Sequence, residues 1–195
     1  MTGSRADALS SRKLLPPGFA FAFSIIDDTD DSTIENARPF YDLLIRLGLR
    51  STKTAWPLPP KTDGSPFRHG ATLSDPSYLD WVRDLASAGF EVTWHCASMD
   101  SSPRERVKEG LERFVQLVGV EPRLHTNHGM NRENIYWGPT RYTSGTLQTA
   151  YKLFGPKRST FEGELERSAY FWGDMCQTQF DYVRGFAFQR LNTLE

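Results

Sequence analysis

The 195-residue sequence contains only two cysteines, Cys96 and Cys176, and they form no metal-binding spacing. A cysteine zinc cluster is therefore excluded, and one disulfide at most does not make a small secreted scaffold. No apolar run reaches the roughly 18 residues that a membrane-spanning helix needs. The N-terminal residues 1–13 lack the apolar core of a signal peptide. We therefore expect a soluble, cytoplasmic protein.

The sequence also has little net charge, with a formal value of -1. This balance gives no general attraction to nucleic acid or to an acidic membrane surface, so neither partner is expected. Its 38% hydrophobic and 24% charged residues are typical of a globular protein. We find no internal repeat and no domain boundary. The expectation is one catalytic domain over residues 1–195, in which 1–17 form a polar lead-in.

What the sequence does contain is an alternation of strand and helix patterns. In residues 19–26 the bulky side chains alternate with small ones, which predicts a strand with one bulky face and one small face. Apolar positions at helical spacing predict helices over 34–47, 76–88 and 103–118, with further strands over 49–56, 90–95 and near Leu124. Such alternation predicts an α/β fold with parallel strands.

Local signals sharpen some of these boundaries. Ser32 and Glu35 have the spacing of a capping box at a helix start, and Pro39 is expected to kink or restart that helix. Beyond Gly129 the pattern weakens. There we expect a short helix over 146–154, a helix over 165–180 interrupted by Gly173, and a last strand over 182–188.

Acidic and imidazole side chains follow the predicted strands. Asp27 and Asp28 close the first strand, His95 closes the third, and His125 and His128 follow the fourth. Because parallel strands end at one edge of a sheet, these groups are expected to converge. Mixed Asp and His ligation suits zinc or another divalent first-row metal, which lowers the pKa of bound water from about 16 to about 7.

Each of these residues also has an ordinary structural interpretation. Aspartates after a strand are common turn residues, and a lone strand-end histidine is more often hydrogen-bonded than metal-bound. His69 lies in a proline-rich loop and is expected to be exposed, whereas Cys96 is expected to be a small core residue. The aromatic residues Trp94, Tyr136, Trp137 and Tyr142 are either core residues or flat surfaces for sugar rings.

Several segments resemble the polysaccharide deacetylases of the NodB-homology superfamily. Residues 25–29, Ile-Ile-Asp-Asp-Thr, are similar to the Thr-Phe-Asp-Asp-Gly that ends the family's first strand. Residues 89–95, Gly-Phe-Glu-Val-Thr-Trp-His, are similar to its Gly-His-Glu-Ile-Gly-Asn-His. Residues 124–129 fall where the family has an Arg-Pro-Pro-Tyr-Gly-like segment. The resemblance covers about residues 19–130 and implies a distorted (β/α) barrel, for which this chain is short, so an incomplete barrel is expected.

The resemblance also implies roles for individual residues. Asp27 corresponds to the catalytic base, Asp28 to a metal ligand and His95 to a second ligand. A backbone N–H near Gly129, or His128, would face the oxyanion of the tetrahedral intermediate.

Two departures from the family pattern affect this ligand set. Thr29 stands in place of a glycine, and Met99 stands where the family has a second histidine. The third ligand would then come from His128, or from His125 as an alternative ligand or an orienting residue.

The leading hypothesis is a divalent-metal-dependent hydrolase, with zinc as the expected ion, that removes N- or O-acetyl groups from carbohydrate. Asp27 would take the proton from the metal-activated water. Asn127, Gly129 and Trp137 are the expected substrate-binding residues.

Two alternatives remain at this stage. The first is a catalytically degenerate barrel that serves as a carbohydrate-binding or interaction module. The second is a glycoside hydrolase that uses two carboxylates from among Asp27, Asp28 and Asp30.

Overall fold

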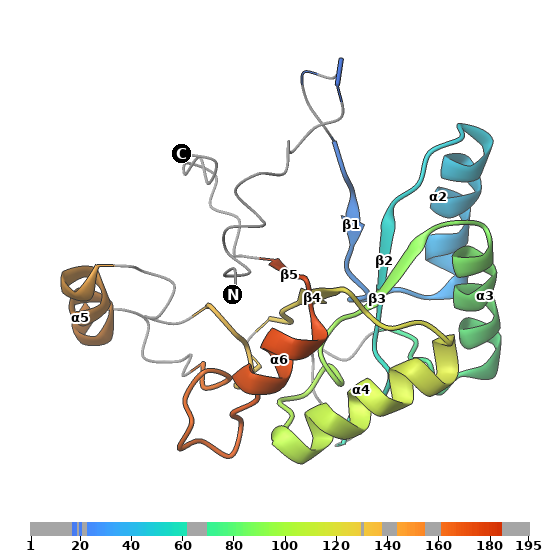
Figure 1. The fold of residues 1–195 in the computed structure, drawn as a ribbon. Helices are drawn as coiled ribbons and strands as arrows, with labels where there is room; N and C mark the ends of the chain where they lie inside the picture. Colours follow the sequence, from blue (N-terminus) through green and yellow to red (C-terminus); the bar gives the residue numbers. More distant parts are fainter. Residues whose placement is uncertain are drawn as a thin grey trace, which may run out of the picture.

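The computed structural model describes residues 17–18, 20, 23–61, 70–129, 131–137, 144–154 and 161–184 (Figure 1). The strands are β1 (Ile26–Asp27), β2 (Thr52–Ala55), β3 (Glu91–Trp94), β4 (Leu124–Thr126) and β5 (Tyr182–Arg184). The helices are α2 (Ile34–Arg46), α3 (Pro76–Ser87), α4 (Arg104–Val118), α5 (Gly145–Phe154) and α6 (Gly173–Gln179).

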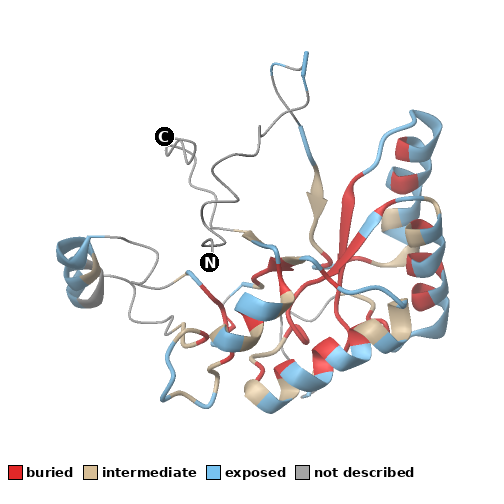
Figure 2. Cartoon of the chain, viewed as in Figure 1, coloured by how far each residue is buried: buried red, intermediate tan, exposed pale blue. Residues whose placement is uncertain are grey.

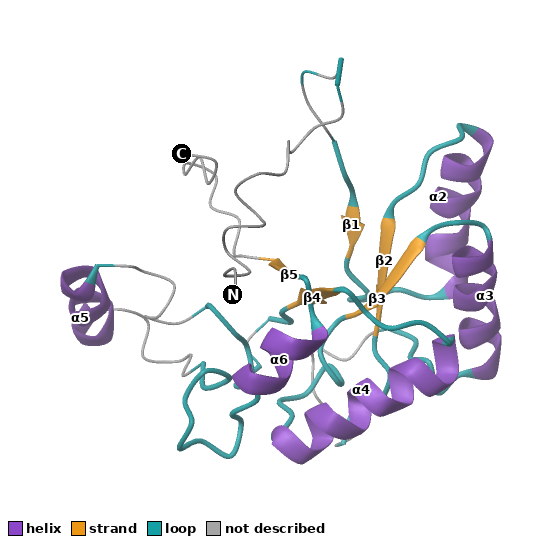
Figure 3. Cartoon of the chain, in the orientation of Figure 1, coloured by secondary structure: helices purple, strands orange, loops and turns teal. Residues whose placement is uncertain are grey.

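The strands form one sheet in the order β1-β2-β3-β4-β5, and every neighbouring pair is parallel. The sheet is curled into a half-barrel, and α2, α3 and α4 lie along one side of it (Figure 3). The predicted class, a distorted and incomplete (β/α) barrel, is therefore confirmed. A parallel sheet in sequence order also confirms that the strands end at one edge.

The N-cap of α2 lies one residue later than predicted. Thr33 Oγ1 accepts a hydrogen bond from the Asn36 backbone N–H, and Asn36 Oδ1 accepts one from the Thr33 backbone N–H, so the capping box predicted for Ser32 and Glu35 is shifted by one position. Ser32 is instead buried and accepts a hydrogen bond from Lys53. The helix is assigned without a break through Pro39, so it does not restart there, and the alternative, a kink at this residue, stays a prediction.

The predicted helix over residues 165–180 is also wrong in its first half. Residues 161–172 form turns, and only α6 is helical, so Gly173 begins the helix rather than interrupting it. The reason is close packing at Gly163, where a Cβ atom would lie 2.2 Å from the carbonyl oxygen of Glu133. The backbone N–H groups of Trp172 and Gly173 both donate to the Gly163 carbonyl, which fixes a turn where the pattern predicted a helix.

The first predicted strand is short in the structure. Only Ile26 and Asp27 are assigned to β1, and the Phe23 side chain is 82% exposed, so this member of the predicted bulky face is not buried. Phe19 and Phe21 lie outside the described residues, as do His69, Tyr142 and residues 185–188 of the predicted last strand.

The apolar core lies between the sheet and helices α2, α3 and α4 (Figure 2). Its fully or almost fully buried members include Tyr41, Tyr78, Val82, Trp94, Val107, Phe114 and Trp172. Among the described residues, no helix is sufficiently long and apolar to cross a membrane.

Gly110 tests the packing of α4 on this core, because a Cβ atom there would lie 2.7 Å from Ala97 Cβ. Alanine favours a helix by about 1 kcal/mol over glycine, but the overlap forces α4 away from the loop that follows β3. We expect Gly110→Ala to lower the free energy of unfolding by about 1–3 kcal/mol in urea denaturation. The exposed Lys108→Ala on the same helix should change it by less than about 0.5 kcal/mol. A Gly110→Ala variant as stable as the parent would contradict the packing described.

Candidate metal centre

Asp27 and Asp28 are adjacent, and they face opposite sides of the sheet because side chains alternate along a strand. The Asp27 carboxylate faces the helix layer, where its Oδ2 accepts hydrogen bonds from Tyr41 of α2 at 2.9 Å and from Lys53 of β2 at 2.8 Å. The Lys53 side chain is fully buried and also donates to Ser32 Oγ. Burial, followed by the negative charge of Asp27, raises the pKa of Tyr41.

Asp28 faces the interior of the curled sheet. Its carboxylate forms a bidentate ion pair with Arg184, through distances of 2.5 Å and 2.8 Å. Its Oδ1 lies 4.0 Å from His95 Nδ1. The predicted metal ligand is therefore bonded to an arginine, next to the imidazole with which it was expected to share an ion.

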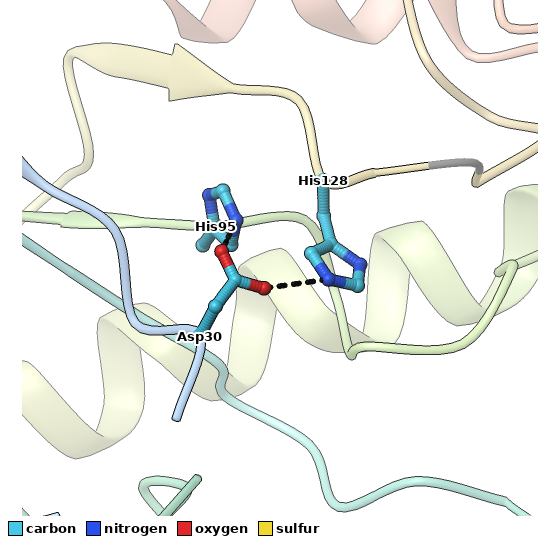
Figure 4. A group of neighbouring side chains, drawn as sticks. All are labelled: Asp30, His95 and His128. Atoms are coloured by element: carbon cyan, nitrogen blue, oxygen red, sulfur yellow. Dashed lines mark ion pairs between the residues drawn. The ribbon is translucent and has the colours of Figure 1, made fainter. Parts of the chain in front are cut away.

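The group that comes together is Asp30, His95 and His128 (Figure 4). Asp30 Oδ1 lies 2.7 Å from His128 Nε2, and Asp30 Oδ2 lies 3.3 Å from His95 Nε2. One ligand atom from each residue lies within 4.8 Å of the others. Two of these residues were predicted as ligands, and the third is a carboxylate two positions beyond the predicted Asp28.

His95 is held through its Nδ1. This nitrogen lies 2.7 Å from the Thr126 hydroxyl, which also lies 3.1 Å from the Trp94 carbonyl oxygen. The other ring nitrogen, Nε2, is buried and lies 3.3 Å from Asp30 Oδ2. In the neutral tautomer that donates from Nδ1 to Thr126, Nε2 carries the lone pair and faces Asp30. Burial lowers the pKa of His95, although Asp30 and Asp28 oppose the shift.

The opposite shift occurs at the other imidazole. Burial alone would lower the pKa of His128, but the hydrogen bond and charge of Asp30 outweigh it, and the pKa is raised. Burial alone would raise the pKa of Asp30, but the two imidazoles hold it well below its usual range. Trp56 is fully buried, with its ring centroid 5.2 Å from that of His128 and 5.9 Å from that of His95.

His125 lies outside this group, on the helix-facing side of β4. Its Nδ1 accepts a hydrogen bond from Trp94 Nε1, and its Nε2 pairs with Asn127 Oδ1 at 2.9 Å. The ring is fully buried and packs against Trp172 and Phe180, and burial lowers its pKa to about 3. Both nitrogens are engaged, so His125 offers no lone pair to a metal and the predicted alternative ligand is corrected.

The predicted substrate-binding residues have mixed surroundings. Asn127 is buried, and its amide bonds His125 Nε2 and both backbone groups of Ile135, so its side chain is directed into the protein. Gly129 has a φ of +40° and its carbonyl accepts a hydrogen bond from Asn134. Trp137 is half-buried and its ring packs edge-on against Phe161. A substrate contact for Gly129 and Trp137 stays a prediction.

Two of the residues that follow the group have unusual backbone conformations. Asp31 and Cys96 have φ values of +57° and +58°, and they come directly after Asp30 and His95. Left-handed backbone at non-glycine residues costs about 1 kcal/mol or more, so the surrounding contacts must maintain it. Cys96 is buried, as predicted, and burial raises the pKa of its thiol. Met99 is buried as well.

The donor set fits a divalent transition metal. Two imidazole nitrogens and one carboxylate are typical zinc ligands, and three protein ligands leave a position for water or substrate. Donors about 2.1 Å from one ion lie at most about 4.2 Å apart, so the group needs only small side-chain movements to surround an ion. His95 Nε2 and the Asp30 carboxylate lie 3.3 Å apart, and a cation between them would interact favourably with both.

Sequence reasoning missed Asp30 as a ligand because it followed the family motif, which carries its metal ligand in the Asp-Asp pair. The alternation of side chains was available from the sequence, and it indicates that only one of Asp27 and Asp28 faces the interior. It does not fix the path of residues 29–31, where Thr29 hydrogen-bonds Tyr78 and Asp31 is left-handed.

Glu133 is a second buried carboxylate, in the loop that follows His128. It accepts hydrogen bonds from the backbone N–H of Ser102 at 2.9 Å and from Asn131 at 3.0 Å, which connects this loop to the one after β3. Burial raises the pKa of Glu133 to about 7, although these two hydrogen bonds oppose the shift.

No protein-family model matches the chain, and no curated protein matches it. The Xyl-CE4 domain of a multidomain xylanase from the hindgut metagenome of Trinervitermes trinervoides is similar, with 12% identity, a TM-score of 0.41 and coverage of 82% of this chain and 85% of that one. A family 4 acetyl xylan esterase from Clostridium thermocellum, in complex with cobalt, has 10% identity, a TM-score of 0.39 and coverage of 82% and 86%. Both are NodB-like polysaccharide deacetylases, the family that the sequence motifs resemble. Similarity at this level carries no argument about activity, which rests on the side chains of this chain.

The raised pKa of Glu133 predicts how stability depends on pH. The folded state holds this proton up to about pH 7, whereas the unfolded state releases it near 4.5, so the free energy of unfolding falls as pH rises between these values. The fall amounts to about 3 kcal/mol, because each pH unit costs about 1.4 kcal/mol. Urea denaturation from pH 4.5 to 8 should show this fall for the parent and a smaller one for Glu133→Gln. The exposed Glu105→Gln should follow the parent, and parallel curves for Glu133→Gln would contradict the prediction.

Proposed function

We propose that this chain is a divalent-metal-dependent hydrolase that removes acetyl groups from carbohydrate. Asp30, His95 and His128 would hold the ion, for which zinc is the first candidate. When bound, the ion would act as a Lewis acid on the substrate carbonyl and lower the pKa of a coordinated water.

One observation carries the proposal: the buried His95 Nε2 faces one oxygen of Asp30 at 3.3 Å, and His128 Nε2 bonds the other oxygen at 2.7 Å. The tautomer of His95 that donates from Nδ1 to Thr126 would leave Nε2 free to bind an ion. A hydrogen-bonding partner that holds the other ring nitrogen is the usual support for a metal-binding histidine.

For the general base, the contacts favour Asp28 over the predicted Asp27. A base must come within hydrogen-bond reach of the water that it activates. Asp27 accepts hydrogen bonds from Lys53 and Tyr41 in the helix layer, whereas Asp28 faces the interior, 4.0 Å from His95 Nδ1. We propose that Asp28 takes the proton and that Asp27 has a structural role.

The substrate class follows from the sequence resemblance to polysaccharide deacetylases, which implies hydrolysis of an acetyl amide or ester on a sugar. Gly129 and Trp137 would lie along the substrate. Acetylated xylo-oligosaccharides and N-acetylglucosamine oligomers are the matched pair of test substrates, because they separate O-acetyl from N-acetyl hydrolysis.

A non-catalytic carbohydrate-binding module is the second candidate, and one contact favours it. Asp30 and His128 lie 2.7 Å apart, so their charges already compensate each other without an ion. Saccharide binding that survives a chelator, without acetate release, would select this alternative.

Metal binding provides the first test of the leading proposal. Calorimetric titration with Zn²⁺ or Co²⁺ should give one site per chain, and Asp30→Asn should weaken it at least about 100-fold because a charged ligand is lost. Asp31→Asn removes the same charge one position away and should bind as the parent does. Co²⁺ should also quench fluorescence in the parent and less in Trp56→Phe, since Trp56 packs on both imidazoles. A parent that binds neither ion would contradict the proposal.

The choice of base is tested by acetate release at saturating Zn²⁺. Asp28→Asn should lower kcat by about 10²–10⁴-fold, the usual contribution of a general base. Asp27→Asn should lower the free energy of unfolding, because it leaves buried Lys53 without its charged partner, while kcat of the folded fraction changes less. The reverse pattern, with kcat lost at Asp27 and kept at Asp28, would restore Asp27 as the base.

A further inference from the structure

The Arg184–Asp28 ion pair joins the two opposite edges of the sheet. Asp28 follows β1, Arg184 ends β5, and the three strands β2, β3 and β4 lie between them. In a flat sheet these edges would be about 19 Å apart, four spacings of about 4.8 Å, which the two side chains cannot span. The pair therefore exists only because the sheet is curled, and it closes the open side of the half-barrel.

Arg184 reaches this position through the register of β5. Its Cα pairs with that of Thr126 on β4, the residue whose hydroxyl is hydrogen-bonded to His95 Nδ1. Residues paired across a parallel ladder point to the same face, so Arg184 and Thr126 both face the interior. Arg184 thus lies beside Thr126, which is hydrogen-bonded to His95. Through Asp28 it also holds the segment that leads from β1 to Asp30.

The segment from Asp27 to Ser32 is attached to the protein from two sides. On the helix side, Asp27 and Ser32 bond Lys53, and Thr29 bonds Tyr78 of α3. On the interior side, among the described residues, the side-chain contacts of this segment are those of Asp30 with the imidazoles and those of Asp28 with Arg184 and His95. The ion pair of Arg184 with Asp28 thus holds this segment on the interior side, and Arg184 is not a member of the Asp30, His95 and His128 group.

We propose that Arg184 is a positioning residue that closes the half-barrel through Asp28 and thereby holds Asp30 against His95 and His128. This inference rests on the proposed metal site and extends it to a residue 156 positions away in sequence from Asp28. The planar fork of arginine suits this role, because two parallel hydrogen bonds fix orientation as well as distance. A lysine would keep the charge and lose the second bond.

The test compares Arg184→Gln and Arg184→Lys with Arg123→Gln. Arg123 is a matched control, since it forms an exposed ion pair with Asp181 at the other end of the β4–β5 pairing. Two measurements are made on each full-length variant. One is amide hydrogen exchange without metal, and the other is Co²⁺ affinity together with the visible absorption of the Co²⁺-loaded protein.

We expect Arg184→Gln to exchange at least tenfold faster at residues 27–32, to bind Co²⁺ at least tenfold more weakly, and to show a changed Co²⁺ spectrum. Arg184→Lys should lie between this variant and the parent, and Arg123→Gln should match the parent in all three. A role in global stability alone would speed exchange throughout the chain and leave the Co²⁺ spectrum unchanged, which would overturn the proposal. If Arg184→Gln does not fold, Arg184→Lys decides by the same three readouts.

Failure of this inference is distinct from failure of the metal site. A parent that binds Co²⁺, with Arg184 variants equal to it in affinity, spectrum and exchange, overturns the positioning role and leaves the proposed function intact. A parent that binds no Co²⁺ removes the proposed function, and unchanged exchange at residues 27–32 would then remove the positioning role as well.

Discussion

The alternation of side chains along parallel strands that end at one edge decides which residues of this protein can meet. Neighbours in sequence are divided between the helix layer and the interior of the curled sheet. The helix-facing members of three such pairs are Asp27, Trp94 and His125, and the interior members are Asp28, His95 and Thr126. A displacement of one position at any strand end exchanges an interior group for a packing group, so the candidate site depends on this register throughout.

The sequence was sufficient for the fold class and for the meeting of His95 and His128, because both follow from patterns with a fixed period. It was insufficient where the chain leaves a strand. Asp30 reaches the imidazoles through residues 29–31, whose path depends on the buried Thr29–Tyr78 bond and on left-handed Asp31. His125 was misassigned for a related reason: imidazole chemistry is readable from sequence, but the Trp94 and Asn127 contacts that occupy both nitrogens are tertiary.

The adjacent carboxylates Asp27 and Asp28 have different roles, because Asp27 bonds Lys53 on the helix side and Asp28 bonds Arg184 in the interior. Asp27 compensates the charge of Lys53, whose side chain is fully buried, and a buried lysine without a partner would cost several kcal/mol. Asp27 is therefore needed to compensate the charge of Lys53, whereas Asp28 and Asp30 face the interior and contact His95. The acidic run after β1 is therefore more than a polar turn: its members face different surroundings, and the buried lysine accounts for one that the site does not use.

The contacts within the Asp30, His95 and His128 group also bear on which ion it could accept. An entering ion must replace the 2.7 Å contact between Asp30 and His128, so it has to bind nitrogen as well as oxygen strongly. Mg²⁺ and Ca²⁺ prefer all-oxygen surroundings and gain little from two imidazoles. Zn²⁺ and Co²⁺ bind both donor types, and His95 Nε2, with Thr126 holding the other ring nitrogen, would supply the nitrogen ligand that such ions require. If the site holds an ion, as proposed, the ion pair between Asp30 and His128 would act as a filter, because it keeps the carboxylate in place and would make weakly nitrogen-binding cations poor competitors.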